Sequence, residues 1–281
     1  MKTAAVDILK SVSKTKRKAF KKEFKNLKKG DRSEETIHDA RVAARRLNAL
    51  LEVLSIIKKS NKNNKKISKT IKKSRKKLGG TRDLQIARDF LSKNQQDIAN
   101  FDFDLFEDYY LQTQKKFFKE INSFINDFKL KKINKKLKKI IKKSLKDFND
   151  QLPLDSIFGE IENEKKTLLL DFELLNKDDK SSFHQLRKDL KKLRYKLEIM
   201  NEIDSGDYNI DLYKTFQDEL GEIQDIVVIK EILNNKFQSV DTKADLESLN
   251  DFLDKKQNNI IDNVLNEKDL FLKMMARLTT E

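Results

Sequence analysis

The sequence contains no cysteine, no tryptophan, 1 proline and 6 glycines among its 281 residues. Without cysteine the chain has no disulfide framework, no thiolate nucleophile and no Cys-type zinc or iron–sulfur site. Its 2 histidines leave little for a metal site built from histidine and carboxylates. No apolar run approaches the roughly 18 residues that span a bilayer, and Asp7 interrupts the short apolar patch near the amino terminus. We therefore expect a cytoplasmic protein with no signal peptide and no membrane partner.

The scarcity of glycine and proline also predicts an all-α fold, because hairpins need turn residues of these kinds. Apolar side chains recur at intervals of three and four residues, and no segment alternates with a period of two. Thr36, or Ser33 together with Thr36, is expected to cap the helix that follows Gly30. Ser181 or Ser182 is expected to cap another. The apolar stripes are Ile37, Ala40, Ala44, Leu47, Leu51 and Leu54; Leu130, Ile133, Leu137 and Ile140; and Phe183, Leu186, Leu190, Leu193 and Leu197.

The charge is strongly positive, since 61 Lys and Arg stand against 46 Asp and Glu, a formal net charge of +15. Residues 58–77 hold eleven Lys or Arg and no acid, and residues 129–146 hold ten Lys and no acid. Both segments keep an apolar stripe and are predicted to be amphipathic helices. The first run is the stronger binding candidate because it adjoins the motifs described next. The second is expected to be mainly a solvated face.

An internal repeat is the most informative feature of the sequence. The segment HDARVAARRL, which begins at His38, is matched 146 residues later by HQLRKDLKKL, which begins at His184. The segment LGGTRD, which begins at Leu78, is matched 142 residues later by LGEIQD, which begins at Leu220. Two motifs in the same order at nearly equal offsets indicate two related helical halves, about 1–150 and 151–281, with an approximate two-fold axis.

The polar side chains of each motif are predicted to form one narrow stripe along a helix, opposite the apolar side chains. A solvated face has no reason to keep histidine, two cations and glutamate at matched positions in both halves, so ligand binding is favoured. The two glutamates are candidates to hold the arginines in place. Each histidine is either structural or a donor to phosphate. The stripes are His38, Arg41, Arg45, Asn48 and Glu52 in the first half, and His184, Arg187, Lys191, Arg194 and Glu198 in the second.

Enzyme motifs are missing from the sequence. It contains no GxxxxGK[ST] loop, no GxSxG and no GxGxxG. His38-Asp39 is similar to the dyad of metal-dependent phosphohydrolases, but those enzymes need further His and Asp ligands. We therefore expect no catalytic residues, no metal and no cofactor.

The segments IHDARVAARRL and FHQLRKDLKKLRY, followed by LGGTRDL and LGEIQDI respectively, resemble the CHAD family, the conserved histidine α-helical domain. The paired order covers nearly the whole chain. The resemblance implies one CHAD-like domain over residues 1–281, in which two pseudo-two-fold-related helical bundles surround a basic central cavity. It also implies binding of inorganic polyphosphate, in some members at polyphosphate granules. The halves differ at Asn48, which corresponds to Arg194, and at Gln224, which corresponds to Arg82.

The leading hypothesis is a non-catalytic binder of inorganic polyphosphate, which only arrays of charge-assisted hydrogen bonds can hold. The main alternative is a nucleic-acid-binding or general polyanion-binding protein. It is disfavoured because single strands stack on exposed aromatics, and the phenylalanines occupy mostly apolar helical positions. A scaffold that recruits acidic proteins is a third hypothesis. The candidate polyphosphate-binding residues are His38, Arg41, Arg45, Arg46, Lys69, Lys72, Arg75, Lys76, Arg82, His184, Arg187, Lys188, Lys191, Lys192 and Arg194.

Overall fold

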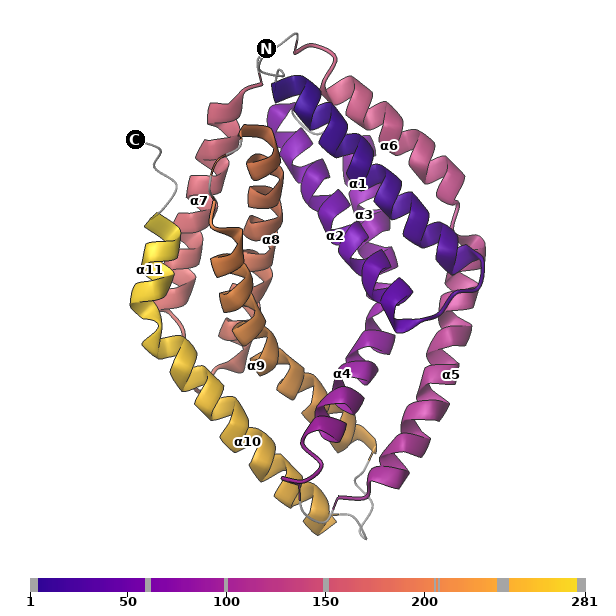
Figure 1. The fold of residues 1–281 in the computed structure, drawn as a ribbon, viewed down its shortest axis with the longest axis vertical. Helices are drawn as coiled ribbons and strands as arrows, with labels where there is room; N and C mark the ends of the chain where they lie inside the picture. Colours follow the sequence, from indigo (N-terminus) through magenta and orange to yellow (C-terminus); the bar gives the residue numbers. More distant parts are fainter. Residues whose placement is uncertain are drawn as a thin grey trace. The chain divides into compact units, whose positions relative to one another are not determined.

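The computed structural model describes residues 5–58, 62–98, 101–148, 152–204, 206, 208–236 and 243–276. All regular secondary structure in these residues is α-helical, which confirms the all-α prediction (Figure 1). The predicted boundary between the sequence halves falls at residues 149–151, outside the described residues. The helices are α1 (Ala5–Lys28), α2 (Glu34–Ile57), α3 (Lys62–Lys77), α4 (Gly79–Lys93), α5 (Phe103–Asp127), α6 (Leu130–Ser144), α7 (Leu154–Glu173), α8 (Lys180–Asp204), α9 (Ile210–Lys236), α10 (Lys243–Asn266) and α11 (Lys268–Ala276).

The chain forms two compact units, each built from three segments. Unit 1 comprises Met1–Gly79, Glu120–Thr167 and Lys191–Ile210. Unit 2 comprises Gly80–Lys119, Leu168–Leu190 and Asp211–Glu281. Each unit takes segments from both sides of residue 150, so neither coincides with one half of the sequence repeat. The pseudo-two-fold relation between the halves stays a prediction.

The turn before α2 fixes the start of the helix that carries the first motif. Gly30 follows α1 with a φ of 96°, a left-handed conformation that glycine adopts without a Cβ clash. The N–H groups of Gly30 and Asp31 donate to carbonyls in the last turn of α1, as in a Schellman ending. The Ser33 hydroxyl then accepts a hydrogen bond from the backbone N–H of Thr36 at 3.2 Å. The predicted cap of this helix is therefore confirmed.

The cap of α8 differs from the prediction. α8 begins at Lys180, so Ser181 and Ser182 lie inside its first turn. A carboxylate oxygen of Asp179 accepts hydrogen bonds from the backbone N–H of Ser181 at 2.9 Å and from its hydroxyl at 2.6 Å. These bonds lower the pKa of the Asp179 carboxyl. A carboxylate replaces the predicted serine because its charge also interacts favourably with the helix dipole.

Unit 1 is held together by the apolar faces of α1, α2, α3 and α6. α1 and α3 each pack against α2, and α6 packs against all three (Figure 1). Every residue of the predicted α2 stripe from Ile37 to Leu54 is at most 2% exposed. The rings of Phe20 and Phe24 stack with centroids 4.3 Å apart, and Phe24 stacks on Phe128 at 4.9 Å. Because this face of α2 is buried, its motif cations project away from the core.

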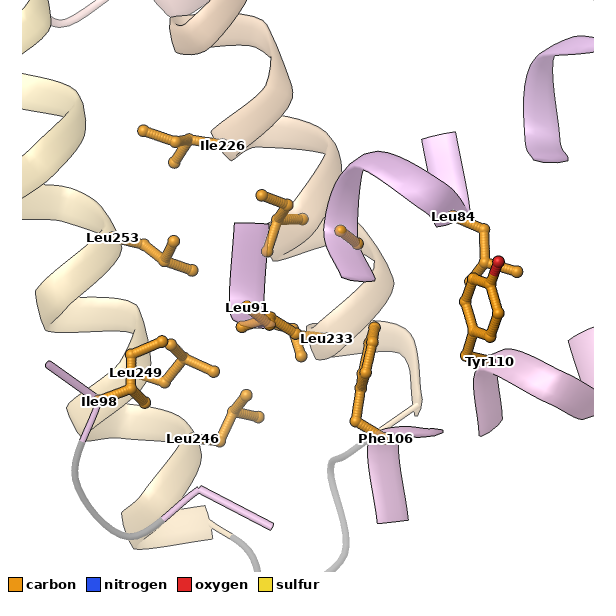
Figure 2. Close-up of a cluster of buried hydrophobic side chains, with 12 residues drawn as sticks. Leu84, Leu91, Ile98, Phe106, Tyr110, Ile226, Leu233, Leu246, Leu249 and Leu253 are labelled. Atoms are coloured by element: carbon orange, nitrogen blue, oxygen red, sulfur yellow. The ribbon is translucent and has the colours of Figure 1, made fainter. Parts of the chain in front are cut away.

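Unit 2 has its own core, to which α4, α5, α9 and α10 all contribute (Figure 2). Figure 2 shows Leu91 of α4 and Leu249 of α10 within this cluster. Gly80 explains the close approach of α5, because a Cβ there would lie 2.7 Å from the ring of Phe117. The third residue of the LGGTRD motif thus lies where helix packing requires a small residue.

Candidate functional site

The positive charge of the protein is concentrated in unit 1. The segments of unit 1 contain 42 Lys and Arg against 19 Asp and Glu, a formal net charge of +23. Those of unit 2 contain 19 Lys and Arg against 27 Asp and Glu, a net charge of −8. A polyanion is attracted to regions of positive potential, so the charge distribution favours a polyanion site in unit 1.

The first motif lies on α2, as predicted. His38 and Arg46 are exposed, and Arg41 and Arg45 are half-buried. Asn48 is nearly buried and both ends of its amide are engaged within the helix pair α2–α3, as described next. The first half therefore presents its cations from the first four turns of α2.

Glu52 joins α2 to α3. Its Oε1 accepts a hydrogen bond from the Asn48 amide at 2.8 Å, and the Asn48 carbonyl oxygen accepts one from the Ser68 hydroxyl at 2.6 Å. The Nζ of Lys72 lies 3.7 Å from the same Glu52 oxygen. Asn48 is a structural residue of this interface, and Lys72 is held beside it.

Glu198 joins α2 to the carboxyl-terminal part of α8. Its Oε1 lies 3.3 Å from Nη1 of Arg194, one turn earlier on the same helix. Its Oε2 lies 3.2 Å from Nε of Arg46 on α2. The Arg194 guanidinium also lies 4.6 Å from the centroid of the Tyr195 ring, a cation–π contact. Glu198 thus holds Arg194 in place, as expected from its spacing, and also holds Arg46 of α2, which the spacing did not predict.

Arg45 and Arg75 remain without such a carboxylate. Neither forms an ion pair with Asp or Glu in the described part of unit 1, although both are half-buried. Burial lowers the pKa of the Arg75 guanidinium and the charge of Arg45 lowers it further, whereas Tyr195 and Glu52 raise it. Two mutually repelling guanidiniums in a partly desolvated position favour an anion nearby.

These side chains form one constellation, which we call the arginine cluster. It draws on three helices: α2, α3 and α8. Guanidinium groups present paired N–H donors that match the oxygens of phosphate, and the glutamates limit how far they can move. Among the described residues, no group of three or more His, Asp or Glu has the arrangement of a metal site. The cluster consists of Arg45, Arg46, Lys72, Arg75 and Arg194.

Besides His38 and Arg41 of α2, four predicted residues of unit 1 lie outside this cluster or at its margin. Lys192 pairs with Glu164 of α7, which also accepts a bond from Lys196 at 2.6 Å. Lys69 lines a cavity between α3 and α6. Lys76 is exposed and Lys191 is half-buried.

The remaining predicted residues belong to unit 2. Arg82 of α4 donates to the amide oxygen of Gln85 at 2.9 Å. Arg187 of α8 lies against α9 at Gly221, where a Cβ would be 3.1 Å from its Nη2. The glycine of the second motif therefore makes room for the arginine of the first. His184 is half-buried and Lys188 is exposed.

Three residues that shape the site were not identified from the sequence: Ser68, Glu164 and Lys196. Ser68 follows no motif, and its role depends on how α3 packs against α2. Lys196 is 2% exposed although lysine is rarely buried, and its partner Glu164 comes from a distant segment. Only the i, i+4 spacing of Lys192 and Lys196 gave a signal, because it places both on one face of α8.

Comparisons with known proteins agree with this architecture. A family model for the CHAD domain matches residues 15–234. The chain belongs to the CHAD family. The crystal structure of the CHAD domain from the plant Ricinus communis is similar with a TM-score of 0.71, covering 99% of this chain and 93% of that chain at 16% identity. PptA from Streptomyces chartreusis is similar with a TM-score of 0.68, covering 98% of this chain and 100% of that chain at 12% identity.

The sequence matches none of the curated proteins with which it was compared. No helix in the described part of the chain is long and apolar enough to cross a membrane. The similar solved structures share the all-helical fold of this CHAD protein. At 12–16% identity they do not indicate which of its side chains bind a ligand.

Proposed function

We propose that this CHAD protein binds inorganic polyphosphate without catalysing a reaction on it. The observation that carries the proposal is that Arg45 and Arg75 interact with each other and form no ion pair with Asp or Glu among the described residues, while Tyr195, which interacts with Arg75, lies under the guanidinium of Arg194. Membership of the CHAD family, which is associated with polyphosphate binding, supports the same ligand. We place the protein in the cytoplasm and propose polyphosphate granules as one location for it.

Polyphosphate suits a site of this kind for physical reasons. The chain carries roughly one negative charge per phosphate and has no base edges or apolar groups, so it is held by charge-assisted hydrogen bonds alone. Such bonds contribute about 1.5–3 kcal/mol each to binding, more than bonds between neutral groups. The positioned arginines bind paired oxygens, while Lys72 and Lys76 supply adaptable point charges.

The cations of the second half of the sequence are also expected to bind polyphosphate. His184, Arg187 and Lys188 of unit 2 and Lys191 at the start of the next unit 1 segment repeat the α2 stripe in sequence. We propose that they contact further phosphates of a long chain, together with His38, Arg41 and Arg82 from the first half. The two sequence repeats would then act on one ligand.

The test compares two variants that each lose three positive charges. Arg45→Gln/Arg75→Gln/Arg194→Gln removes the centre of the arginine cluster, and Lys135→Gln/Lys138→Gln/Lys142→Gln removes three exposed charges from α6. We expect affinity for long-chain polyphosphate to fall by about 1,000-fold or more in the first variant, since three charge-assisted bonds of about 1.5 kcal/mol or more are lost. The second should lose about threefold, because its charges act only through a screened field. Calorimetric titration measures both.

Arg75 and Arg194 are half-buried, so folding is checked by circular dichroism and thermal melting. If the triple variant unfolds, Arg45→Gln/Arg46→Gln on α2 replaces it, because Arg46 is half exposed. Equal loss of affinity in the cluster and α6 variants would mean that only net charge matters, and the proposed site would be wrong. Equal displacement of polyphosphate by single-stranded DNA at matched charge would instead favour a general polyanion-binding protein.

A further inference from the structure

Two adjacent cavities in unit 1 flank the start of α6. One, with a volume of about 620 Å³, lies between α3 and α6, and the other, of about 1020 Å³, lies between α1 and α6. Asp127, Phe128, Lys129 and Lys132 line both cavities, so the two share a wall. We call this continuous surface the lysine groove, because lysines make up most of its lining.

Lysines from two helices border the groove at helical spacing. Lys21, Lys25 and Lys28 project from one face of α1 into the larger cavity. Lys66, Lys69 and Lys73 do the same from α3 in the smaller one. The two rows border α6 from two different helices, since α1 and α3 both pack against it. A ligand in the groove would meet positive charge along both borders.

The start of α6 adds four more lysines between these rows. Lys131 and Lys136 join Lys129 and Lys132, which gives ten lysines in the two cavities against the single carboxylate of Asp127. None of the ten ammonium groups forms an ion pair in the described part of the chain. The first turn of α6 has no acidic residue and no side-chain cap, so its free N–H groups add to the positive potential.

The lining also restricts the chemistry of the ligand. Phe128, Leu130 and Ile133 are 6–7% exposed, and the other aromatic residue of the lining is the half-buried Phe124, so the groove offers no row of aromatics on which successive bases could stack. No arginine lines either cavity. A groove with ten flexible point charges against one carboxylate fits a flexible polyanion of high charge density.

α3 connects the groove to the arginine cluster. We measure positions around the axis of α3 from Arg75, at about 100° per residue. On this scale Lys72 lies at about 60°, Lys76 at about 100°, Lys69 at about 120° and Lys73 at about 160°. Arg75 and Lys72 lie in the arginine cluster, and Lys69 and Lys73 line the groove. The exposed Lys76 lies between the two sets, so cations run without interruption from one site to the other.

We propose that the lysine groove is a second polyphosphate-binding surface, which takes up the part of a long chain that extends beyond the arginine cluster. This inference rests on the proposed function for the identity of the ligand. Once one part of the chain is held, the next binds at a high effective concentration, so weak lysine contacts add substantially to the affinity for long chains. Tripolyphosphate is too short to gain from this linkage.

The test uses the full-length protein and three variants. Lys25→Gln/Lys66→Gln/Lys132→Gln removes one exposed groove lysine from each of α1, α3 and α6, in that order. Lys135→Gln/Lys138→Gln/Lys142→Gln is the matched control, because these lysines are on α6 but line neither cavity. The third is the arginine-cluster variant. We expect the groove variant to lose about tenfold in affinity for long-chain polyphosphate and to keep the wild-type affinity of the arginine cluster for tripolyphosphate.

The outcomes separate the groove from the cluster. If the groove variant binds long chains as tightly as the α6 control does, the inference is wrong. The arginine cluster is tested separately, by the arginine-cluster variant. If the groove variant loses affinity while the cluster variant does not, the proposed function fails at its site but the groove is supported. If single-stranded DNA or poly-glutamate displaces long-chain polyphosphate from the groove equally well per charge, the assignment to polyphosphate is wrong.

Lysine acetylation followed by mass spectrometry gives a second readout on the unmodified protein. We expect long-chain polyphosphate to slow acetylation of Lys25, Lys66 and Lys132 by about fivefold or more relative to the α6 control lysines, because bound phosphates shield the ammonium groups. Equal protection of both sets would show that the polyanion only raises the general ionic shielding, and would overturn the groove.

Discussion

At the scale of single residues, carboxylates decide which cations are held in place for a ligand. Glu198 holds Arg46 and Arg194, and Glu52 holds Lys72. A fixed guanidinium loses less conformational entropy when it binds an anion than a free one does. The glutamates of the two motifs therefore contribute to binding by positioning cations, even though their own charge opposes a polyanion.

A glutamate in unit 2 gives the protein a predicted pH dependence. Burial first, and then the nearby Glu267 and Glu222, raise the pKa of Glu219 to about 7. Because the folded protein favours the protonated carboxyl, this group's stabilisation is complete below its unfolded pKa and is lost as pH rises through about 7. We expect Glu219→Gln to raise the melting temperature more at about pH 8 than at about pH 5.

Thermal melting across this range checks the prediction, with Glu247→Gln on the exposed face of α10 as the control. The control should shift melting by a similar small amount at every pH. A Glu219→Gln curve parallel to that of the wild-type protein would contradict the raised pKa.

At the scale of helices, the packing of one element on another explains residues that the motifs alone do not. Arg187 of α8 lies across α9 at Gly221, and α5 approaches α4 at Gly80. Both glycines lie within helices, where glycine costs about 1 kcal/mol relative to alanine. This cost is offset because the missing side chain leaves room for a neighbouring helix or its side chain. The two glycines are not equivalent in the repeat, because Gly221 corresponds to Gly79 and Gly80 corresponds to Glu222, so each marks a separate close approach between helices.

Gly221→Ala should separate helix stability from the position of Arg187. A Cβ at this site would be 3.1 Å from Nη2 and 3.4 Å from Nε of Arg187, so the guanidinium must shift by a few tenths of an ångström. We expect stability near that of the wild-type protein, because better helix propensity offsets the crowding, and a fewfold weaker binding of long-chain polyphosphate. Thermal melting and calorimetric titration measure the two effects.

Gly159→Ala is the matched control, since it also replaces a helical glycine but no atom lies within 4 Å of the new Cβ. It should raise the melting temperature and leave binding unchanged. Unaltered binding in Gly221→Ala would show that the position of Arg187 does not matter for the ligand.

At the scale of the whole molecule, the net charge of +15 is the sum of +23 in unit 1 and −8 in unit 2. Binding of a polyanion should therefore depend on salt through a limited set of unit 1 cations. By analogy with single-stranded nucleic acid, each neutralised charge adds about −0.7 to the slope of log affinity against log salt concentration. We expect the arginine-cluster variant to have a slope shallower by about 2.

Titrations at several salt concentrations measure these slopes. The α6 control variant should keep the wild-type slope, because its three lysines contact no phosphate in the proposed arrangement. An unchanged slope in the arginine-cluster variant would mean that these three arginines release no counterions on binding.

The sequence by itself determined the all-α fold and the orientation of each stripe on its helix. The α2 stripe from Ile37 to Leu54 is buried as predicted, because helical periodicity and the hydrophobic effect act locally along one element. Ser33 caps α2 for the same local reason, whereas Asp179 caps α8 because the helix begins before the serines.

Only the tertiary structure decided which cations meet. It directed Arg75 toward Arg45 and Lys69 toward α6, and it paired Lys192 with Glu164. It also paired Arg46 with Glu198, which lies 152 residues later in the chain. The sequence marks all of these as exposed-face cations of similar helices. Which face of a helix meets another depends on how side chains from distant segments pack together, and that information is spread over the whole core rather than contained in a motif.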